Sequence, residues 1–289
     1  MFPAEKPSAE AGGDAREIAV RDTVCKTILN RTSLGDYSLN CYTGCAHACV
    51  YCYARFMQRF HPHPEPWGSF VDVKINAVEV LKRQLRRAKP GDVFTSSACD
   101  GWQPVEARCG LTRRCCELLL ERGFQVNVLT KSALVLRDLE VFAGQTARIG
   151  VSVTTLDEGL RKLWEPHASS VEDRFRVIAE ARRAGLETSI MFGPLLPALS
   201  DDGASIEAML RRAADLGIDR IWVDALNPRP RVWPAVAELL QTRFPELREH
   251  YRRVLFDKPA RGAYLAELGD RVARAAKRLR LADRVARCF

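Results

Sequence analysis

Four cysteines lie within twelve positions of the segment NCYTGCAHACVYCYARFM, residues 40–57. Three of them, Cys45, Cys49 and Cys52, are separated by three residues and then by two. Thiolates at this spacing in one loop can wrap around a cubic iron–sulfur cluster, whose four irons normally take four ligands. Three ligands leave one iron open to a small molecule. The spacing therefore predicts a [4Fe–4S] cluster with one open coordination site.

An open iron can chelate the amino and carboxylate groups of S-adenosylmethionine, and a reduced cluster can pass an electron to its sulfonium. The product is a 5′-deoxyadenosyl radical, which abstracts hydrogen from unactivated carbon. In such chemistry the cofactor carries out the difficult step, while the protein supplies position and excludes competing reactions. The cysteine loop therefore favours a radical enzyme.

Two other interpretations of the same thiols remain open. A zinc site could add His47, His61 or His63, although structural zinc usually uses two separated ligand pairs and no second pair stands out. A closed, electron-transferring cluster could take Cys41 as its fourth ligand, because Cys41 precedes the loop by a suitable interval. Either arrangement would make the chain a non-enzymatic metal protein.

The composition is typical of a globular protein, with 289 residues of which 47% are hydrophobic and 28% charged. No apolar run reaches the roughly 18 residues of a membrane span, and the first residues lack the pattern of an export signal, so we expect a cytoplasmic protein. In a reducing compartment, clustered thiols are better explained as metal ligands than as disulfides. The net charge of +8 favours anionic partners, but only weakly, because the basic residues are spread over helical stretches.

The elements that must position the cysteines alternate between strand and helix. Strand patterns occupy residues 37–40, 93–98, 125–130, 147–155, 187–196 and 219–226. Helical spacing occupies residues 77–88, 112–123, 134–144, 171–185 and 205–217. Gly123, Gly185 and Gly217 stand where helix C-caps would lie. This alternation predicts a parallel sheet of about six β/α units, fewer than the eight of a closed TIM barrel. After Pro234 the pattern is helical to the end of the chain.

The segment CAHACVYC resembles the signature of the radical S-adenosylmethionine superfamily, in which the aromatic residue before the last cysteine, here Tyr51, lies beside the adenine. Several segments follow, in order, the pattern of the spore photoproduct lyase-like branch, often described as DNA repair photolyases. They are NCYTGCAHACVYCYAR, VDVKINA, DGWQPVE, LTKSALVLRD, GVSVTTLD, WEPHASSVEDRF and FGPLLPALSD. The resemblance covers about residues 34 to 224.

The resemblance implies an α/β fold with a partial (β/α)6 barrel of the TIM type and a C-terminal helical extension. The cluster and S-adenosylmethionine would lie at the carboxyl-terminal mouth of the strands, and an external donor such as flavodoxin or ferredoxin would supply the electron. We expect three parts: an N-terminal extension over residues 1–33, the radical enzyme's partial barrel over 34–230, and a helical cap over 231–289.

The segment SSACDGWQPVEARC, residues 96–109, follows a predicted strand and should lie at this mouth. Many radical enzymes place a Gly-Gly-Glu type segment here to hold the amino group of the methionine, and this chain lacks it. The chain supplies other polar groups instead, namely Ser96, Asp100, Gln103 and Glu106, and a carboxylate is a sound partner for a cationic amine. Asp100 and Glu106 could alternatively cap the following turn.

Further cofactor contacts come from later strands. By resemblance, Lys131 and Ser152, at the ends of the third and fourth strands, would bind the carboxylate of S-adenosylmethionine. Arg174 could do the same through a bidentate pair, or could be a surface helix residue.

Lyases of this branch use a cysteine near residue 99 to return a hydrogen atom to a product radical, because an S–H bond is weak. Cys99 is the candidate here, as a hydrogen donor or a sulfur donor, and the alternative is a buried inert thiol. Cys115 and Cys116 point about 100° apart on a helix, so a second cluster built from them is not expected.

The resemblance and the positive charge together favour a nucleotide-type substrate. A small phosphorylated nucleoside in a biosynthetic pathway is our expectation, because the sequence shows no helix-turn-helix and no dense basic stripe for DNA. The alternative is repair of a DNA lesion, which would require the damaged base to be flipped into the barrel.

Overall fold

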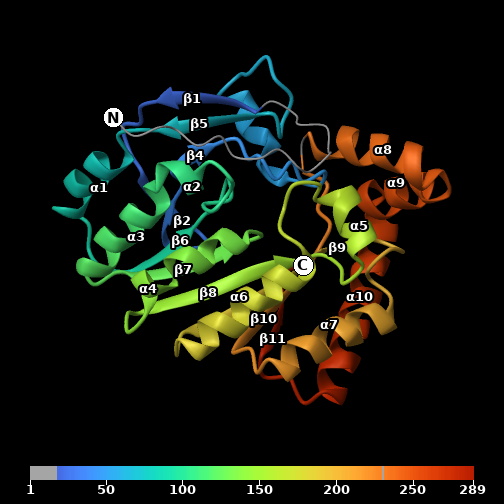
Figure 1. Cartoon of the computed structure of the whole chain (residues 1–289). Coiled ribbons are helices and arrows are strands. Elements are labelled where there is room, and N and C mark those ends of the chain that lie inside the picture. Colours follow the sequence, from blue (N-terminus) through green and yellow to red (C-terminus); the bar gives the residue numbers. More distant parts are fainter. Residues whose placement is uncertain (1–17, 230) are drawn as a thin grey trace, which may run out of the picture.

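The computed structural model describes residues 18–229 and 231–289. Its core is one eight-stranded sheet, in the order β11, β10, β9, β8, β7, β6, β3, β2 (Figure 1). These strands are β2 (Leu29–Thr32), β3 (Gly35–Leu39), β6 (Asp92–Thr95), β7 (Gln125–Thr130), β8 (Ala147–Val153), β9 (Glu187–Leu195), β10 (Arg220–Ala225) and β11 (Val285–Arg287). All six predicted strands are present and pair in parallel, whereas β2 joins β3 in an antiparallel hairpin. The α/β fold is confirmed, and the sheet is open, with β2 and β11 at its edges.

Helices follow the strands as their spacing predicts. They are α1 (Ala77–Leu85), α2 (Glu106–Cys109), α3 (Leu111–Glu121), α4 (Leu139–Phe142), α5 (Glu158–Trp164), α6 (Val171–Arg183) and α7 (Gly203–Asp215). The predicted helix over 134–144 is divided into a 3-10 turn, η2 (Ala133–Asp138), and α4. Gly123, Gly185 and Gly217 have φ values of +73°, +74° and +65°, so they end α3, α6 and α7 in the left-handed conformation that glycine adopts without strain.

The helices cover the sheet through their apolar faces. Helix α6 packs on β8 and β9, and α3 packs on β7 and α1. In α6 the buried residues Val171, Phe175 and Ile178 recur at helical spacing, while Ser170 caps the first turn by accepting a hydrogen bond from the Asp173 backbone N–H. This packing fixes the carboxyl ends of β6, β7 and β8, which carry most of the predicted site residues.

A smaller three-stranded sheet stands beside the main one. It consists of β1 (Ala19–Thr23), β5 (Phe70–Lys74) and β4 (Tyr42–Thr43), with β1 parallel and β4 antiparallel to β5. Strand β4 leads directly into the cysteine loop. Residues 18–33 of the expected N-terminal extension therefore contribute strands to both sheets, and residues 1–17 lie outside the described part of the chain.

The C-terminal region consists of α8 (Val232–Arg243), a 3-10 turn η3 (Pro245–Leu247), α9 (Arg248–Phe256) and α10 (Lys258–Arg278), followed by β11. The expectation that this region is helical to its end is wrong at β11, where Val285 pairs with Ile221 of β10. Three residues are too few to show a strand pattern, so the edge of the sheet decides their conformation. None of the described helices is both long and apolar enough to span a membrane.

Candidate active site

The cysteine loop runs from β4 to η1 (Tyr53–Arg59) and is pressed against neighbouring backbone. Gly44 has φ +83°, and a Cβ at this position would come within 2.4 Å of the Phe70 carbonyl oxygen, so only glycine fits. The buried amide of Gln103 clamps the loop from the other side. Its Oε1 accepts a hydrogen bond from the Ala46 N–H at 2.8 Å, and its Nε2 donates to the Gly44 carbonyl at 3.2 Å. Gly44 and Gln103 thus both constrain the path of the loop.

The three predicted cluster ligands lie near one another in this loop. Cys45 and Cys49 are buried and Cys52 is half-buried. Burial raises the pKa of all three thiols, and the pKa of Cys45 is raised further by Asp100 and by the other two thiols. A cationic group placed among the three thiols would lower their pKa values, because it stabilises thiolates. The chemistry of the donor set therefore fits an iron–sulfur cluster.

The arrangement differs from a site for one metal ion. Among the described residues, no three His, Cys, Asp or Glu side chains converge closely enough to hold a single ion. A cubic cluster needs ligands that lie further apart, because each thiolate binds a different iron atom. His63 is occupied elsewhere, with Nε2 2.9 Å from Asp72 Oδ2 and its ring stacked on Phe70. The zinc interpretation gains no support from this geometry.

Lys131 follows β7 and places its ammonium beside the cysteine loop. Its Nζ lies 5.8 Å from the centre of the Tyr51 ring, and its charge lowers the pKa of Cys49, which burial raises to about 12. Among the described carboxylates, none forms an ion pair with Lys131. Ser152, near the end of β8, is buried and keeps a hydroxyl that no described residue uses. Their expected contacts to an anionic cofactor group remain a prediction.

Tyr51 is held from its hydroxyl end by a buried carboxylate. The hydroxyl donates to Glu165 and also lies 2.9 Å from Thr154 Oγ1, and the ring stacks on Trp164 at a centroid distance of 6.4 Å. These contacts fix the ring of Tyr51 beside Cys49 and Cys52. Its expected place next to an adenine remains a prediction.

Arg174 is fully buried and therefore is not a surface helix residue. Its guanidinium forms an ion pair with Glu165, which is also fully buried, and donates to the carbonyls of Ser152 at 2.9 Å and Ser169 at 3.0 Å. Burial would raise the pKa of Glu165, but Arg174 and Lys131 lower it to about 2. Because its donors are engaged inside the protein, the structure gives Arg174 a role in positioning Glu165 in place of the expected cofactor contact.

Asp100 likewise holds protein groups in place. Its carboxylate accepts hydrogen bonds from Thr130 Oγ1 at 2.6 Å and from the backbone N–H of Lys131 at 2.8 Å, and it lies 3.4 Å from His47 Nδ1. Burial would raise its pKa, but His47 and these hydrogen bonds lower it below the usual value.

Ser96 differs, because its buried Oγ has no partner among the described residues. A buried hydroxyl without a partner is a vacant hydrogen-bonding position that a cofactor can fill.

Glu106 is fully buried at the start of α2, just ahead of α3. Its carboxylate accepts hydrogen bonds from the backbone N–H groups of Thr112 and Arg113 at 3.1 and 3.0 Å and from the Tyr42 hydroxyl. Both oxygens are therefore used, and burial raises the pKa of Glu106. The structure corrects the expected cofactor role: this carboxylate caps α3, as the alternative interpretation proposed.

Cys99 lies between the loop and the main sheet. It packs against the group formed by Cys45, Trp67 and Phe70, and its thiol is 3.9 Å from Asn40 Oδ1. Burial raises the pKa of Cys99 to about 12.

Cys41, in contrast, turns toward Cys115 of α3, with the two sulfur atoms 3.8 Å apart. The structure thus contradicts Cys41 as a fourth ligand.

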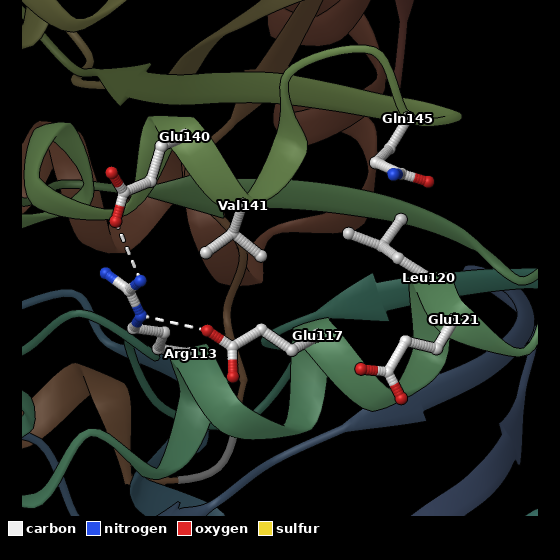
Figure 2. Close-up of a pocket in the computed structure, with 7 residues that line it drawn as sticks. All are labelled: Arg113, Glu117, Leu120, Glu121, Glu140, Val141 and Gln145. Atoms are coloured by element: carbon white, nitrogen blue, oxygen red, sulfur yellow. Dashed lines mark hydrogen bonds and ion pairs between the residues drawn. The ribbon is translucent and has the colours of Figure 1, made fainter.

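One groove of the described structure lies away from the cysteine loop. It has a volume of about 490 Å³ and is lined by residues of α3, α4 and the segment after α4, which Figure 2 shows. Its one cationic side chain, Arg113, is already paired with Glu117 at 3.0 Å and Glu140 at 2.8 Å. Carboxylates dominate this lining and would repel phosphate. None of the predicted site residues lines the groove.

Four functional contacts were missed by sequence reasoning. Gln103 was noted only as a polar group, although it clamps the loop, and Glu165 and Asn40 were not considered. Trp67 was also not considered, yet it packs beside Cys45. The signal available for Glu165 was its place in the segment WEPHASSVEDRF, which carries part of the family resemblance.

Comparisons with known proteins identify the family of this chain. The model of the Radical SAM superfamily matches residues 39–213. An uncharacterised protein of Mycobacterium bovis is 31% identical over 262 residues, covering 86% of this chain and 76% of that protein. An uncharacterised protein of Methanocaldococcus jannaschii is 33% identical over 166 residues, which cover 57% of this chain and 62% of that protein.

Spore photoproduct lyases are similar in both sequence and fold. That of Clostridium acetobutylicum is 25% identical over 185 residues, covering 62% of this chain and 52% of the lyase. The structure of a spore photoproduct lyase complexed with dinucleoside spore photoproduct superposes with a TM-score of 0.66 at 13% identity, covering 93% of this chain and 82% of that one. With its matched domain and its three-cysteine loop, this chain belongs to the Radical SAM superfamily, whose enzymes use a [4Fe–4S] cluster and S-adenosylmethionine.

Proposed function

We propose that this enzyme abstracts a hydrogen atom from a nucleotide-type substrate, using a cluster held by Cys45, Cys49 and Cys52. The observation that carries the proposal is the gathering of these three thiols in one clamped loop with the Lys131 ammonium beside them. When bound, the cluster and S-adenosylmethionine supply the radical chemistry. The contribution of the protein is to bind, orient and enclose the reacting groups.

The described residues have distinct parts in this proposal. Lys131 and the Ser152 hydroxyl hold the carboxylate of S-adenosylmethionine, because an ammonium and a free hydroxyl are suitable donors to it. The vacant Ser96 hydroxyl binds a polar group of the same cofactor. Tyr51, fixed through Glu165, offers its ring to the adenine. Asp100 supports these contacts by holding the backbone N–H of Lys131 at 2.8 Å.

Cys99 is proposed as the residue that returns a hydrogen atom to the substrate radical. Its thiol packs beside Cys45, so a substrate that reaches the cluster can also reach Cys99. In this step the S–H bond breaks, a C–H bond forms, and an unpaired electron remains on sulfur until 5′-deoxyadenosine or an added thiol returns a hydrogen atom. A sulfur-donor role would instead leave sulfur in the product, which mass spectrometry of the product distinguishes.

The nature of the substrate follows from charge and from the relatives. The net charge of +8 favours a phosphorylated molecule, and one similar structure holds a dinucleoside. We favour a free nucleotide handled in a biosynthetic pathway, because the basic residues are dispersed and do not form the stripe expected along a DNA backbone.

A second candidate is a reaction on a base within a DNA strand. Tyr53, Phe56 and Phe60 follow the cysteine loop and are exposed, with Tyr53 stacked on Phe56 at 6.4 Å and Phe56 edge-on to Phe60 at 6.3 Å. Exposed aromatic rings in series stack on successive bases of single-stranded nucleic acid. If this surface binds DNA, a lesion-repair or base-modifying reaction is favoured over a reaction on a free nucleotide.

The decisive experiment quantifies 5′-deoxyadenosine under anaerobic conditions after reconstitution, reduction with dithionite and addition of S-adenosylmethionine. Wild type should produce it, Cys45→Ala should not, and the matched control Cys288→Ala, which changes an exposed cysteine, should behave as wild type. Free nucleotides and lesion-bearing DNA are then compared as accelerators. A cluster-loaded wild type that makes no 5′-deoxyadenosine with any of them would refute the proposal.

A further inference from the structure

Trp67 carries a buried N–H group that the protein leaves without a partner. The indole is 4% exposed, and its Nε1 makes no hydrogen bond to any described residue. A buried indole N–H normally finds an acceptor, and leaving it unsatisfied destabilises the protein. This nitrogen is therefore free to donate to an acceptor beside it.

The ring of Trp67 is fixed against the cysteine loop. It packs with Cys45, Ala54 and Phe70, and Cys52 packs against the same group. Its edge-to-face contact with Phe70, at a centroid distance of 5.9 Å and an angle of 88°, limits the orientation of the ring.

The glycine that follows allows this close approach. Gly68 has φ +98°, and a Cβ there would come within 2.5 Å of the Ala48 Cβ in the loop. A larger residue would push the Trp67 segment away from the cysteines. The segment is therefore shaped to lie directly against the loop.

The neighbouring acceptor is the sulfur of Cys52. Cys52 packs against the group of side chains that contains the Trp67 indole, which brings its sulfur beside this ring. A neutral thiol is a weak acceptor. A thiolate bound to iron carries more negative charge and accepts more strongly, so the hydrogen bond that is incomplete in the thiol form becomes favourable.

We propose that the Trp67 indole N–H donates a hydrogen bond to the Cys52 sulfur when this residue ligates the cluster, and thereby raises the reduction potential of the cluster. The inference rests on the proposed function, because it requires Cys52 to be a ligand. The N–H dipole stabilises the reduced cluster, which carries one more negative charge than the oxidised cluster. Trp67 acts through Cys52 and is a positioning residue that does not touch the substrate.

The first test compares the reconstituted wild type with Trp67→Phe, which keeps an aromatic ring and removes the N–H. A redox titration followed by electron paramagnetic resonance measures the midpoint potential. At a fixed potential near the midpoint, we expect the ratio of reduced to oxidised cluster to fall about tenfold in the variant, which is a shift of about 59 mV for a one-electron couple. The matched control is Trp233→Phe, whose indole packs on Phe256 of α9 and should leave the potential unchanged. Equal potentials in wild type and Trp67→Phe would overturn the inference.

A second measurement does not depend on the folding of the variant. Wild type is labelled with indole-¹⁵N tryptophan, and pulsed paramagnetic resonance of the reduced cluster should detect a ¹⁵N coupling. A loaded cluster without this coupling contradicts the inference alone. A wild type that cannot be loaded with iron and sulfide contradicts the proposed function and, with it, the inference.

Discussion

The sulfur atoms of Cys41 and Cys115 lie 3.8 Å apart in the fully buried core between the cysteine loop and α3. The hydrogen bond that Cys41 donates to Cys115 is the largest cause of the raised pKa of Cys41, followed by burial. A thiol held in this way stays protonated and faces Cys115 of α3. The pair therefore separates a spectator thiol from the three predicted ligands, which all follow it in the same short segment.

We predict that Cys41→Ala retains the cluster. Iron and sulfide content should equal wild type, and the paramagnetic spectrum of the reduced cluster should still change when S-adenosylmethionine is added. The loss of a small buried side chain should lower the free energy of unfolding by about 1 kcal/mol. Cys49→Ala is the comparison and should lose most of its iron. Loss of iron in Cys41→Ala would restore the closed four-cysteine site.

Gln103→Met should loosen the cysteine loop. The substitution keeps the length of the side chain but leaves the Ala46 N–H and the Gly44 carbonyl without partners, at a cost of about 1–3 kcal/mol each. We expect a reduced iron content after reconstitution and faster loss of iron to a chelator. Gln145→Met changes an exposed glutamine and is the control. Unchanged iron retention in Gln103→Met would show that the loop does not need this clamp.

Glu165→Gln should destabilise the protein strongly. The change leaves the buried guanidinium of Arg174 without its counter-charge, and breaking a buried ion pair from one side costs about 3–5 kcal/mol. Urea unfolding at neutral pH measures the difference. The double variant Glu165→Gln/Arg174→Met should recover part of the loss, because it removes the uncompensated charge. An equal or larger loss in the double variant would contradict this explanation.

The same pair predicts a pH dependence. The pKa of Glu165 is depressed to about 2 in the folded protein, from an unfolded value of about 4.3. A depressed carboxyl pKa stabilises the fold fully above the unfolded pKa, and this stabilisation is lost as the pH falls toward the folded pKa. The difference in unfolding free energy between wild type and Glu165→Gln should therefore be constant above about pH 5 and shrink below it. A difference that stays constant down to pH 3 would argue against the depressed pKa.

Lys131→Met should weaken the binding of S-adenosylmethionine without removing the cluster. A hydrogen bond to a charged group contributes about 1.5–3 kcal/mol, which corresponds to a loss of roughly 10-fold to 100-fold in affinity. Equilibrium binding to the reconstituted enzyme measures this loss, and iron content reports the cluster independently. Lys162→Met, on the exposed side of α5, is the control. Wild-type affinity in Lys131→Met would remove Lys131 from the proposed site.

Much of the fold was predictable because its signals are local. The six parallel strands and the glycine caps of α3, α6 and α7 follow from periodicity within one element and from residues next to its end. Strand β11 was missed, since three residues carry no periodicity and pairing with β10 decides their conformation. The division of residues 134–144 into η2 and α4 was also missed, because both halves show helical spacing.

The amino-acid sequence by itself determined the three-cysteine loop, since its ligands lie within one short segment whose spacing is independent of the rest of the fold. Only the tertiary structure decided which of the surrounding polar groups are free. Glu106 meets Tyr42 across 64 residues of sequence, Cys41 meets Cys115 across 74, and Tyr51 meets Glu165 across 114. Such partners satisfy or bury a side chain through packing of distant elements, and no local pattern contains that information. The chemistry was therefore readable from the loop, whereas the roles of the residues around it depend on how the sheet and its helices close over them.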